Sequence, residues 1–410
     1  MRAIKFNATI PRYLLGFTLS KVYPPILWSG LSCAAYAEVP DPRLPGEDWT
    51  VVQTRMGGIC GTDTSTLFLT TSPYFTPLTS MPHIVGHENV GRLALVGKEV
   101  AGWQAGERVV VEPVLWCQPR GYKELCRFCA RGEINRCERT TEGDLAPGLI
   151  TGACRDTGGS WAPYFLAHRS QLYRVPDEIS DENALMIEPL AVSLHAVLQN
   201  YPRDEDRVLI VGAGSIGLCA LAALRGLGSQ AETVVLARYS FQAEAARRLG
   251  ASAVVMTGRE SGHYEELAEI FGARVRRPIL GKKIVLGGAD IAFECVGSDS
   301  SIDDCLRLTR NGGKVVLVGV PGIARGVDWS AIFAQELVVK AASYYHHAER
   351  FKGKKWRTFD LAIDLLARGA VDLSWMVTHR FPLHEYRRAF DLTHRRADGR
   401  ALKIVFEFPD

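Results

Sequence analysis

The feature that most constrains the fold is a short hydrophobic strand that runs directly into a glycine-rich turn and a helix. Residues 207–211 (RVLIV) predict a buried strand, and residues 218–227 predict a helix. Between them, Gly212 allows a tight turn, Gly214 lets the backbone approach a pyrophosphate, and Gly217 permits close packing of the helix. A strand before the glycines and a helix after them favour a dinucleotide site over a merely tight turn.

The start of this helix supplies the rest of the expected phosphate site. Backbone N–H groups at the N-terminus of the helix can point at the phosphates, and the helix dipole adds a partial positive charge. We therefore expect Ser215 and Ile216 to bind the cofactor together with the three glycines.

Strands alternate with helices over the middle of the chain. Further strands are predicted at 233–237, 289–295 and 313–319, and a second helix at 241–249. This alternation implies right-handed crossovers and a parallel, doubly wound α/β sheet.

The segment 258–288 is long for one crossover. We interpret it as a solvated loop and helix face, and a basic phosphate-binding patch is the alternative. Its cations are Arg274, Arg276, Arg277, Lys282 and Lys283.

The first third of the chain has a different pattern, with short β-branched runs separated by Gly and Pro. The runs at 49–53, 91–96 and 107–111 predict an antiparallel, β-rich domain. After about Val338 the alternation ends; a helix at 359–366 and a closing strand at 402–408 are expected to return to this first domain. A helix is also expected to begin near residue 180, capped by Ser180 or Asp181.

Composition limits the partners. The 410 residues suffice for two domains, and a net charge of only +3 gives no strong field for nucleic acid or membranes. Ten cysteines with a CxxC element favour metal binding over disulfides, which suits a reducing, cytoplasmic compartment. Residues 22–37 carry no charge and end in Ala-Tyr-Ala, so a signal peptide is one reading; two prolines favour a buried, irregular excursion of the first domain instead.

The second strand of the central region bears on the choice of cofactor. An NAD site usually has a carboxylate about 20 residues after the glycines, and counting from Gly217 reaches Ala237, followed by Arg238 and, two residues later, Ser240. A cation without a carboxylate favours the 2′-phosphate of NADP, with Arg238 and Ser240 as its ligands. An exposed arginine without a ligand is the alternative, and NAD stays possible.

Four cysteines, Cys117, Cys126, Cys129 and Cys137, lie within 21 residues of one another. Four thiolates suit a tetrahedral zinc ion and leave no coordination position open, so this site is predicted to be structural.

A second set of candidate ligands is more scattered. Cys60 lies between glycines, and His87 follows Gly86 and precedes Glu88. Each residue alone would more often be a buried core residue. A cysteine, a histidine and a later carboxylate, however, would give the mixed ligands and open fourth position of a catalytic zinc.

These motifs together resemble the zinc-dependent medium-chain alcohol dehydrogenases, in the branch of the polyol, threonine and glucose dehydrogenases. They occur in that family's order over nearly the whole chain from about Glu38. The matching segments are 59–63 (ICGTD), 86–88 (GHE), the four cysteines, 188–192 (EPLAV), 212–217 (GAGSIG), 378–381 (THRF) and 403–406 (KIVF).

The resemblance implies a β-rich, GroES-like catalytic domain at 1–190 and 340–410, and a Rossmann cofactor domain at 191–339. It implies that Cys60, His87 and Glu188 bind the catalytic zinc and that Glu88 is a nearby carboxylate that can exchange onto the metal. Thr62 matches the hydroxyl that passes the substrate proton toward the cofactor ribose. Two zinc ions per chain follow, one catalytic and one structural.

Three departures from the family stand out. Eight residues separate Cys117 from Cys126 where two are usual, Ser65 stands where some relatives have a relay histidine, and residues 10–35 exceed the usual N-terminal strand pair. The extra loop is expected to bulge without moving the thiolates.

We therefore expect a zinc-dependent oxidoreductase that transfers hydride between a secondary alcohol or polyol, or its carbonyl, and NADP. Glu188 in place of a thiolate makes the metal site harder and more hydrated, which in the resembling branch accompanies polar secondary alcohols. The alternatives are a zinc-free enoyl or quinone reductase and a non-catalytic zinc- and nucleotide-binding protein. A homodimer or homotetramer is expected.

Overall fold

The structure is a computed structural model that describes residues 1–258 and 262–409. The chain divides into two compact units. Unit 1 comprises Met1–Glu188, His346–Ala348 and the residues from Phe359 onward, and unit 2 comprises Pro189–Tyr345 and Glu349–Thr358.

Unit 2 is built on a six-stranded sheet in which every neighbouring pair of strands is parallel. The strand order across the sheet is β11-β10-β9-β14-β15-β16, which is the 3-2-1-4-5-6 order of a Rossmann fold. The predicted doubly wound parallel sheet is confirmed. Its strands are β9 (Arg207–Val211), β10 (Glu232–Ala237), β11 (Ala253–Met256), β14 (Ala289–Glu294), β15 (Thr309–Leu317) and β16 (Val338–Ala341).

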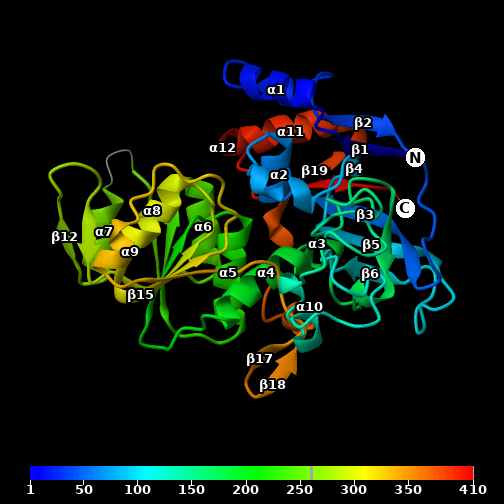
Figure 1. Ribbon diagram of the computed structural model, residues 1–410. Helices are drawn as coiled ribbons and strands as arrows, with labels where there is room; N and C mark the ends of the chain where they lie inside the picture. Colours follow the sequence, from blue (N-terminus) through cyan, green and yellow to red (C-terminus); the bar gives the residue numbers. More distant parts are fainter. Residues whose placement is uncertain (259–261, 410) are drawn as a thin grey trace. The chain divides into compact units, whose positions relative to one another are not determined.

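Helices connect these strands and surround the sheet, as Figure 1 shows for α5 to α9. The predicted helix at 218–227 begins three residues earlier, at Ser215, because Gly214 takes the N-cap position. The helices are α4 (Ile187–Leu198), whose first two residues end unit 1, α5 (Ser215–Gly226), α6 (Ser240–Arg248), α7 (His263–Ile270), α8 (Asp299–Leu308) and α9 (Ser330–Ala334). A hairpin of β17 (Glu349–Phe351) and β18 (Lys354–Trp356) completes the unit.

The sixth strand, β16, was not predicted from the sequence, in which the alternation of strands and helices ends near Val338. Val338–Ala341 pair in parallel with β15, so the predicted boundary at 339–340 falls inside a strand. The strand is four residues long and lies at the edge of the sheet, and Val338 is exposed. It therefore lacks the continuous apolar run that marks the central strands of a parallel sheet.

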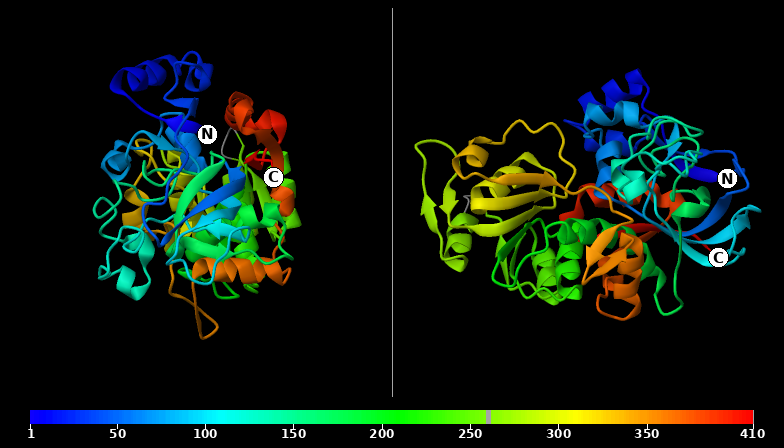
Figure 2. Two further views of the ribbon diagram at one scale, coloured as in Figure 1. Left: turned by 90° about the vertical axis from the view of Figure 1, so that its right-hand side faces the viewer. Right: turned by 60° about the horizontal axis from the view of Figure 1, so that its bottom comes forward.

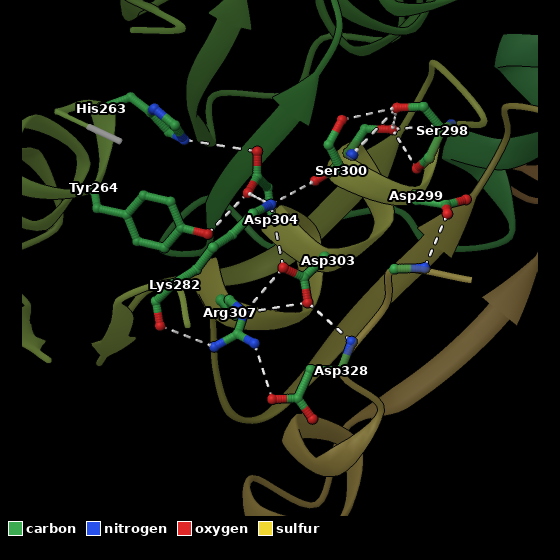
Figure 3. A network of polar contacts seen from close by, with 12 residues as sticks. His263, Tyr264, Lys282, Ser298, Asp299, Ser300, Asp303, Asp304, Arg307 and Asp328 are labelled. Carbon is green, nitrogen blue, oxygen red and sulfur yellow. Dashed lines mark hydrogen bonds and ion pairs between the residues drawn. The ribbon is translucent and has the colours of Figure 1, made fainter. Parts of the chain in front are cut away.

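The long segment 258–288 holds α7 and a hairpin of β12 (Arg274–Arg276) and β13 (Ile284–Leu286); residues 259–261 lie outside the described part. Three of its cations pair with acids. Arg277 lies 3.5 Å from Glu265 on α7. Lys282 Nζ lies 2.9 Å from Asp304 and 3.1 Å from Asp303, both on α8 (Figure 3). Lys283 Nζ lies 2.7 Å from Glu265 on α7. Ion pairing thus explains these two lysines without a phosphate.

Unit 1 contains a seven-stranded, mainly antiparallel sheet, so the predicted β-rich domain is confirmed. Its order is β19-β20-β3-β5-β6-β8, with β7 paired to β3. Only β19 and β20 pair in parallel among these strands. The strands are β3 (Trp49–Gly58), β5 (Asn89–Val96), β6 (Arg108–Val111), β7 (Tyr164–His168), β8 (Leu172–Arg174), β19 (Val377–Pro382) and β20 (Lys403–Glu407).

The N-terminal residues of unit 1 form a three-stranded sheet with an inserted helical segment. Strand β1 (Arg2–Phe6) pairs with β2 (Ala34–Glu38) and with the short β4 (His83–Ile84). Between β1 and β2 lie helix α1 (Ile10–Leu19) and the 3-10 helix η1 (Pro24–Trp28).

The buried excursion expected at 22–37 is confirmed for η1, in which Ile26, Leu27 and Trp28 are buried in the core of unit 1. It is wrong for residues 34–37, which belong to a regular strand. Among the described residues, none of the helices combines the length and the hydropathy needed to cross a bilayer.

The remaining helices of unit 1 are short. The predicted cap at residue 180 is confirmed, because the Ser180 hydroxyl accepts a hydrogen bond from Asn183 N at the start of α3. The remaining α-helices are α2 (Gly61–Leu67), α3 (Asp181–Leu185), α10 (Thr358–Ala367), α11 (Tyr386–His394) and α12 (Arg396–Gly399). Further 3-10 turns lie at Pro73–Leu78, Cys129–Arg131, Ile134–Arg136, Arg169–Gln171, Ser374–Met376 and Leu383–Glu385.

Candidate metal and cofactor sites

Cys60 lies in the sharp turn between β3 and α2. It is the N-cap residue of α2, and its side chain accepts a hydrogen bond from the backbone of Asp63. The Cys60 sulfur therefore faces the free N–H groups at the start of α2.

His87 lies two residues before β5 and is buried. The preceding Gly86 has φ of +101°, and a β-carbon there would overlap the ring of Trp161. Only glycine fits such a position, so the Gly-His pair of the sequence motif has a steric origin.

Asp63, which the sequence analysis did not single out as a ligand-positioning residue, links the two candidate ligands. One carboxylate oxygen accepts a hydrogen bond from Cys60 N at 3.0 Å, and the other lies 3.2 Å from His87 Nδ1. A carboxylate on Nδ1 fixes the ring orientation and leaves Nε2 for a metal. Burial lowers the pKa of His87, but the negative charges of Asp63 and Cys60 outweigh it and raise the pKa well above its ordinary value.

Glu88 forms a buried ion pair with Lys403 in β20, another residue whose role the sequence analysis missed. Lys403 Nζ lies 2.6 Å from one carboxylate oxygen of Glu88 and 2.8 Å from the other. A β-carbon at Gly58 would overlap this carboxylate, so the glycine makes room for it. Since both oxygens of Glu88 are engaged, its predicted exchange onto a metal would require the ion pair to open.

Glu188 is the second residue of α4 and is buried. Burial raises the pKa of its carboxyl to about 7, and the charge of Glu88 adds to the effect while those of His87 and Lys403 oppose it. The charges that act on Glu188 therefore come from the His87–Glu88 pair and from β20, although these segments are far apart in the sequence.

The donor atoms of Cys60, His87 and Glu188 are of the types that zinc prefers: sulfur, imidazole nitrogen and carboxylate oxygen. In the described part of the chain these three atoms do not all lie within 4.8 Å of one another. Sharing one zinc ion at about 2.0–2.3 Å would require them to draw together. The chemistry of the set thus fits a zinc ion, and its spacing is wider than that of a closed site.

Thr62 and Ser65 both lie on α2, but their hydroxyls differ. Thr62 Oγ1 is buried and has no hydrogen-bond partner among the described residues, so it is available to a bound molecule. Ser65 Oγ donates a hydrogen bond to Gly61 O within the helix. Ser65 therefore does not take the place of the relay histidine that some relatives have.

The four cysteines Cys117, Cys126, Cys129 and Cys137 come together, with all four Sγ atoms within 4.8 Å of one another. Cys117 Sγ lies 3.7 Å from Cys137 Sγ, close to the separation of about 3.8 Å between two thiolates on a tetrahedral zinc. Burial raises the pKa of Cys117 to about 11, whereas a hydrogen bond with Cys129 lowers the pKa of Cys137 to about 6. Four thiols this close fit a zinc ion that deprotonates them all.

The eight-residue segment between Cys117 and Cys126 is held in place by a buried arginine. Arg120 donates hydrogen bonds to the carbonyl oxygens of Leu115, Leu145 and Gly148, at 3.0, 3.1 and 2.6 Å. These bonds fix the loop from inside, which explains how it bulges while the thiolates stay together. No motif in the sequence indicates this role of the arginine.

The GxGxxG segment in unit 2 has the geometry of a phosphate-binding turn. Gly212 has φ of +102°, and a β-carbon at Gly217 would overlap Gly212 O, so both positions require glycine. A β-carbon at Gly214, by contrast, would meet no protein atom within 4 Å among the described residues. Space over Gly214 at the start of α5 fits the approach of a pyrophosphate.

The residues predicted to select the cofactor follow β10, next to this turn in the sheet. Arg238 is exposed, with its guanidinium 5.4 Å from the centre of the Tyr239 ring, and Ser240 is exposed at the start of α6. The Ala237 side chain is buried. The structure thus places a cation and a hydroxyl after the second strand, and residues 238–239, which separate that strand from α6, include no carboxylate.

Two family models match the chain. Residues 46–177 match the alcohol dehydrogenase GroES-like domain, and residues 215–368 match the zinc-binding dehydrogenase domain. The first match includes Cys60, His87 and all four clustered cysteines, and the second begins at the start of α5.

Whole-chain relatives point the same way. The chain is 29% identical over 371 residues to the L-threonine 3-dehydrogenase of Anaeromyxobacter sp. (strain K), covering 90% of this chain and 94% of that protein. It is 29% identical over 397 residues to the L-idonate 5-dehydrogenase of Vitis vinifera, covering 96% and 93%. Among solved structures, a zinc-binding dehydrogenase of Sinorhizobium meliloti 1021 bound to NADP matches with a TM-score of 0.68 and 25% identity, covering 92% of this chain and 95% of that one.

Proposed function

We propose the function of this chain from its family: it belongs to the zinc-dependent medium-chain alcohol dehydrogenases, in the branch of the polyol and threonine dehydrogenases. It is a zinc-dependent oxidoreductase that transfers hydride between a secondary alcohol or polyol, or the corresponding carbonyl, and a nicotinamide cofactor. The observation that carries this conclusion is the buried set His87, Glu188 and Asp63 next to Cys60 at the start of α2.

In this proposal Cys60, His87 and Glu188 hold the catalytic zinc. A zinc ion bound there supplies Lewis-acid polarisation of the substrate oxygen. The presence of all three donor types argues against the alternative of a zinc-free enoyl or quinone reductase.

The protein side chains around these ligands have separate tasks. Asp63 holds His87 in the tautomer that presents Nε2, and Lys403 balances the charge of Glu88 beside the site. Thr62 Oγ1 would relay the proton of the substrate hydroxyl by accepting it while giving its own proton to a ribose hydroxyl of the bound cofactor, because Oγ1 is buried and otherwise without a hydrogen-bond partner among the described residues. We assign Glu88 an electrostatic role, since both its oxygens already bind Lys403.

The substrate is proposed to be a small polar secondary alcohol. A carboxylate in place of a second thiolate makes the metal site harder and more hydrated. The named activities of the two relatives, on L-threonine and on L-idonate, concern polar secondary alcohols and support this choice.

A second zinc ion is proposed at the four cysteines, where it would fix the 117–137 lobe and take no part in the chemistry. Four ligand sulfurs leave no open coordination position. We also keep the expectations of a homodimer or homotetramer and of a cytoplasmic location, which rest on the sequence.

For the cofactor we propose NADP. Arg238 would form a charge-assisted hydrogen bond to the 2′-phosphate, with Ser240 adding a hydroxyl donor. The NADP bound to the Sinorhizobium meliloti protein supports this choice by similarity. One charged hydrogen bond contributes roughly 1.5–3 kcal/mol, so kcat/KM should favour NADP over NAD by about one to two orders of magnitude.

This preference is tested by comparing kcat/KM for both cofactors in the wild type and in Ala237→Asp/Arg238→Ser. The double variant should favour NAD, because the introduced carboxylate would repel a 2′-phosphate and the charged bond would be lost. A matched control, Arg247→Ser, removes a cation from the other end of the same helix α6. A wild-type enzyme that favours NAD would show that Arg238 does not bind the cofactor.

The activity itself is tested with a panel of secondary alcohols, polyols and β-hydroxy amino acids, by following absorbance of the reduced cofactor. We expect turnover of polar secondary alcohols and little turnover of simple primary alcohols. A zinc-loaded protein that binds NADPH but oxidises no alcohol and reduces no carbonyl would instead be a non-catalytic binding protein.

A further inference from the structure

Helix α1 and the turn that follows it expose seven large apolar side chains. In the helix Ile10 is 76% exposed and Phe17 is 43% exposed, and Val22 in the next turn is 89% exposed. The other exposed apolar residues of this segment are Leu14, Leu15, Leu19 and Tyr23. We call residues 10–23 the α1 segment.

Helix α1 packs against unit 1 through a small part of its surface. Gly16 is the buried residue of the helix, and a β-carbon there would lie 3.0 Å from Leu69 Cδ1. The following η1 then anchors the chain in the core through Trp28. In all three views the helix lies at the periphery of unit 1, so most of its circumference faces away from the core (Figures 1 and 2).

The charged side chains of the N-terminal 37 residues all have one sign. From Met1 to Ala37 the chain has no Asp or Glu, whereas it has four cations, of which Arg12 and Lys21 lie in the α1 segment. Lys21 Nζ lies 4.8 Å from the centre of the Phe17 ring, so a cation is held directly beside an exposed aromatic side chain. The net charge of +3 for the whole chain conceals this local excess.

A second copy of the chain is a poor match for this surface. A helix of ten residues is about 15 Å long, and such a strip falls well short of the roughly 800 Å² per partner that a stable interface buries. Two copies would also bring their cations together. An apolar helix face bordered by cations and free of acids is instead the pattern of helices that lie in the surface of an anionic membrane.

We propose that the α1 segment docks this dehydrogenase onto the surface of an anionic lipid bilayer, with the aliphatic and aromatic side chains in the headgroup boundary. Arg12 and Lys21 contact the acidic headgroups. The association is peripheral and reversible, because a helix this short cannot span the membrane.

The test uses the purified full-length, zinc-loaded enzyme and vesicle flotation. Vesicles of phosphatidylcholine alone are compared with vesicles containing roughly 30% phosphatidylglycerol as the acidic lipid. We expect binding to the acidic vesicles that weakens with added salt. Arg12→Gln/Lys21→Gln should weaken it about 30-fold, since each cation near such a surface contributes a factor of about five.

A second variant removes the apolar part. Leu14→Ser/Phe17→Ser/Val22→Ser should weaken binding by roughly two orders of magnitude, because three exposed hydrophobic side chains are lost. Its matched control is Ile279→Ser/Leu280→Ser, which removes two aliphatic residues that are 101% and 88% exposed between β12 and β13. Zinc content and alcohol oxidation in solution should stay unchanged in all variants.

Three results would overturn the proposal. The first is that the wild-type protein does not float with acidic vesicles. The second is that the Ile279/Leu280 control loses as much vesicle binding as the variant of the α1 segment. The third is a wild-type oligomer that dissociates when the α1 segment is substituted. The last result, measured by light scattering without lipid, would show that a second copy covers the helix.

Discussion

The two sets of candidate metal ligands in unit 1 are built in opposite ways. The four cysteines lie within 21 residues, and a loop pinned by Arg120 brings their sulfurs within 4.8 Å of one another. Cys60, His87 and Glu188 come from three distant segments, and their donor atoms are more widely spaced.

The difference reflects what each site has to do. A structural site gains from closure, because all four positions of the metal are filled and binding contributes directly to folding. A catalytic site must leave a position open, and the proposed one here depends on residues that are not candidate ligands. Asp63 orients one ligand, and the Glu88–Lys403 pair supplies charge from another strand.

The largest expected effect is the loss of the four-cysteine site. Cys126→Ser should reduce the zinc content from two ions per chain to one and make unit 1 unfold at a much lower temperature. Structural zinc contributes on the order of 10 kcal/mol in small zinc-binding peptides. Elemental analysis and thermal unfolding measure the two effects.

A matched control for this variant is Cys33→Ser, which changes a buried cysteine of unit 1 outside both ligand sets. Its zinc content should stay at two. If the wild-type protein contains one zinc ion and Cys126→Ser leaves that number unchanged, the four cysteines do not hold a zinc ion.

The next effect falls on catalysis and spares the fold. Cys60→Ala or His87→Ala should lower kcat/KM by at least roughly a thousandfold, because the Lewis acid is lost. Binding of NADPH, followed by its fluorescence, should persist because the glycine-rich turn lies in unit 2. Full activity in Cys60→Ala would rule out the zinc mechanism.

Breaking the buried Glu88–Lys403 ion pair should lower the stability of the protein. Lys403→Met leaves Glu88 buried without its partner and should lower the free energy of unfolding by about 3–5 kcal/mol, measured by urea denaturation. The double variant Glu88→Gln/Lys403→Met removes both charges and should recover most of the lost free energy of unfolding.

The exposed pair Lys98–Glu47, at 3.5 Å, provides the control, since Lys98→Met should change stability by less than about 1 kcal/mol. If Lys403→Met is no more destabilising than Lys98→Met, the pair does not support the site.

The smallest predicted effect concerns pH. Burial raises the pKa of Glu188 from its ordinary 4.5 to about 7, so below about pH 7 its carboxyl is neutral and must lose a proton before it can bind zinc. Affinity for the catalytic zinc should therefore fall as pH decreases from 7 toward 4.5. Each proton released adds about one to the slope of log affinity against pH.

Zinc retention against a competing chelator measures this slope in wild type and in Glu188→Gln. The variant should bind zinc more weakly, with a slope smaller by about one. An unchanged slope would show that Glu188 releases no proton on metal binding and is not a ligand.

Much of the chemistry was predictable because it depends on residues close together in the sequence. The GxGxxG turn follows a strand and opens α5 as expected, and Gly217 is required because its β-carbon would overlap Gly212 O. The cysteine spacing predicted a four-sulfur cluster, and the structure brings the four sulfurs together, because short loops can do so whatever the rest of the fold.

The sequence by itself determined the family, the two-part α/β and β-rich architecture, and the candidate ligands, since periodicity and motif spacing are local properties of the chain. Only the tertiary structure decided which residues support those ligands. Lys403 meets Glu88 across a separation of 315 residues, and β16 joins the sheet only through pairing with β15. The exposure of α1 was likewise decided by packing, because an apolar residue looks the same in sequence whether a core covers it or not.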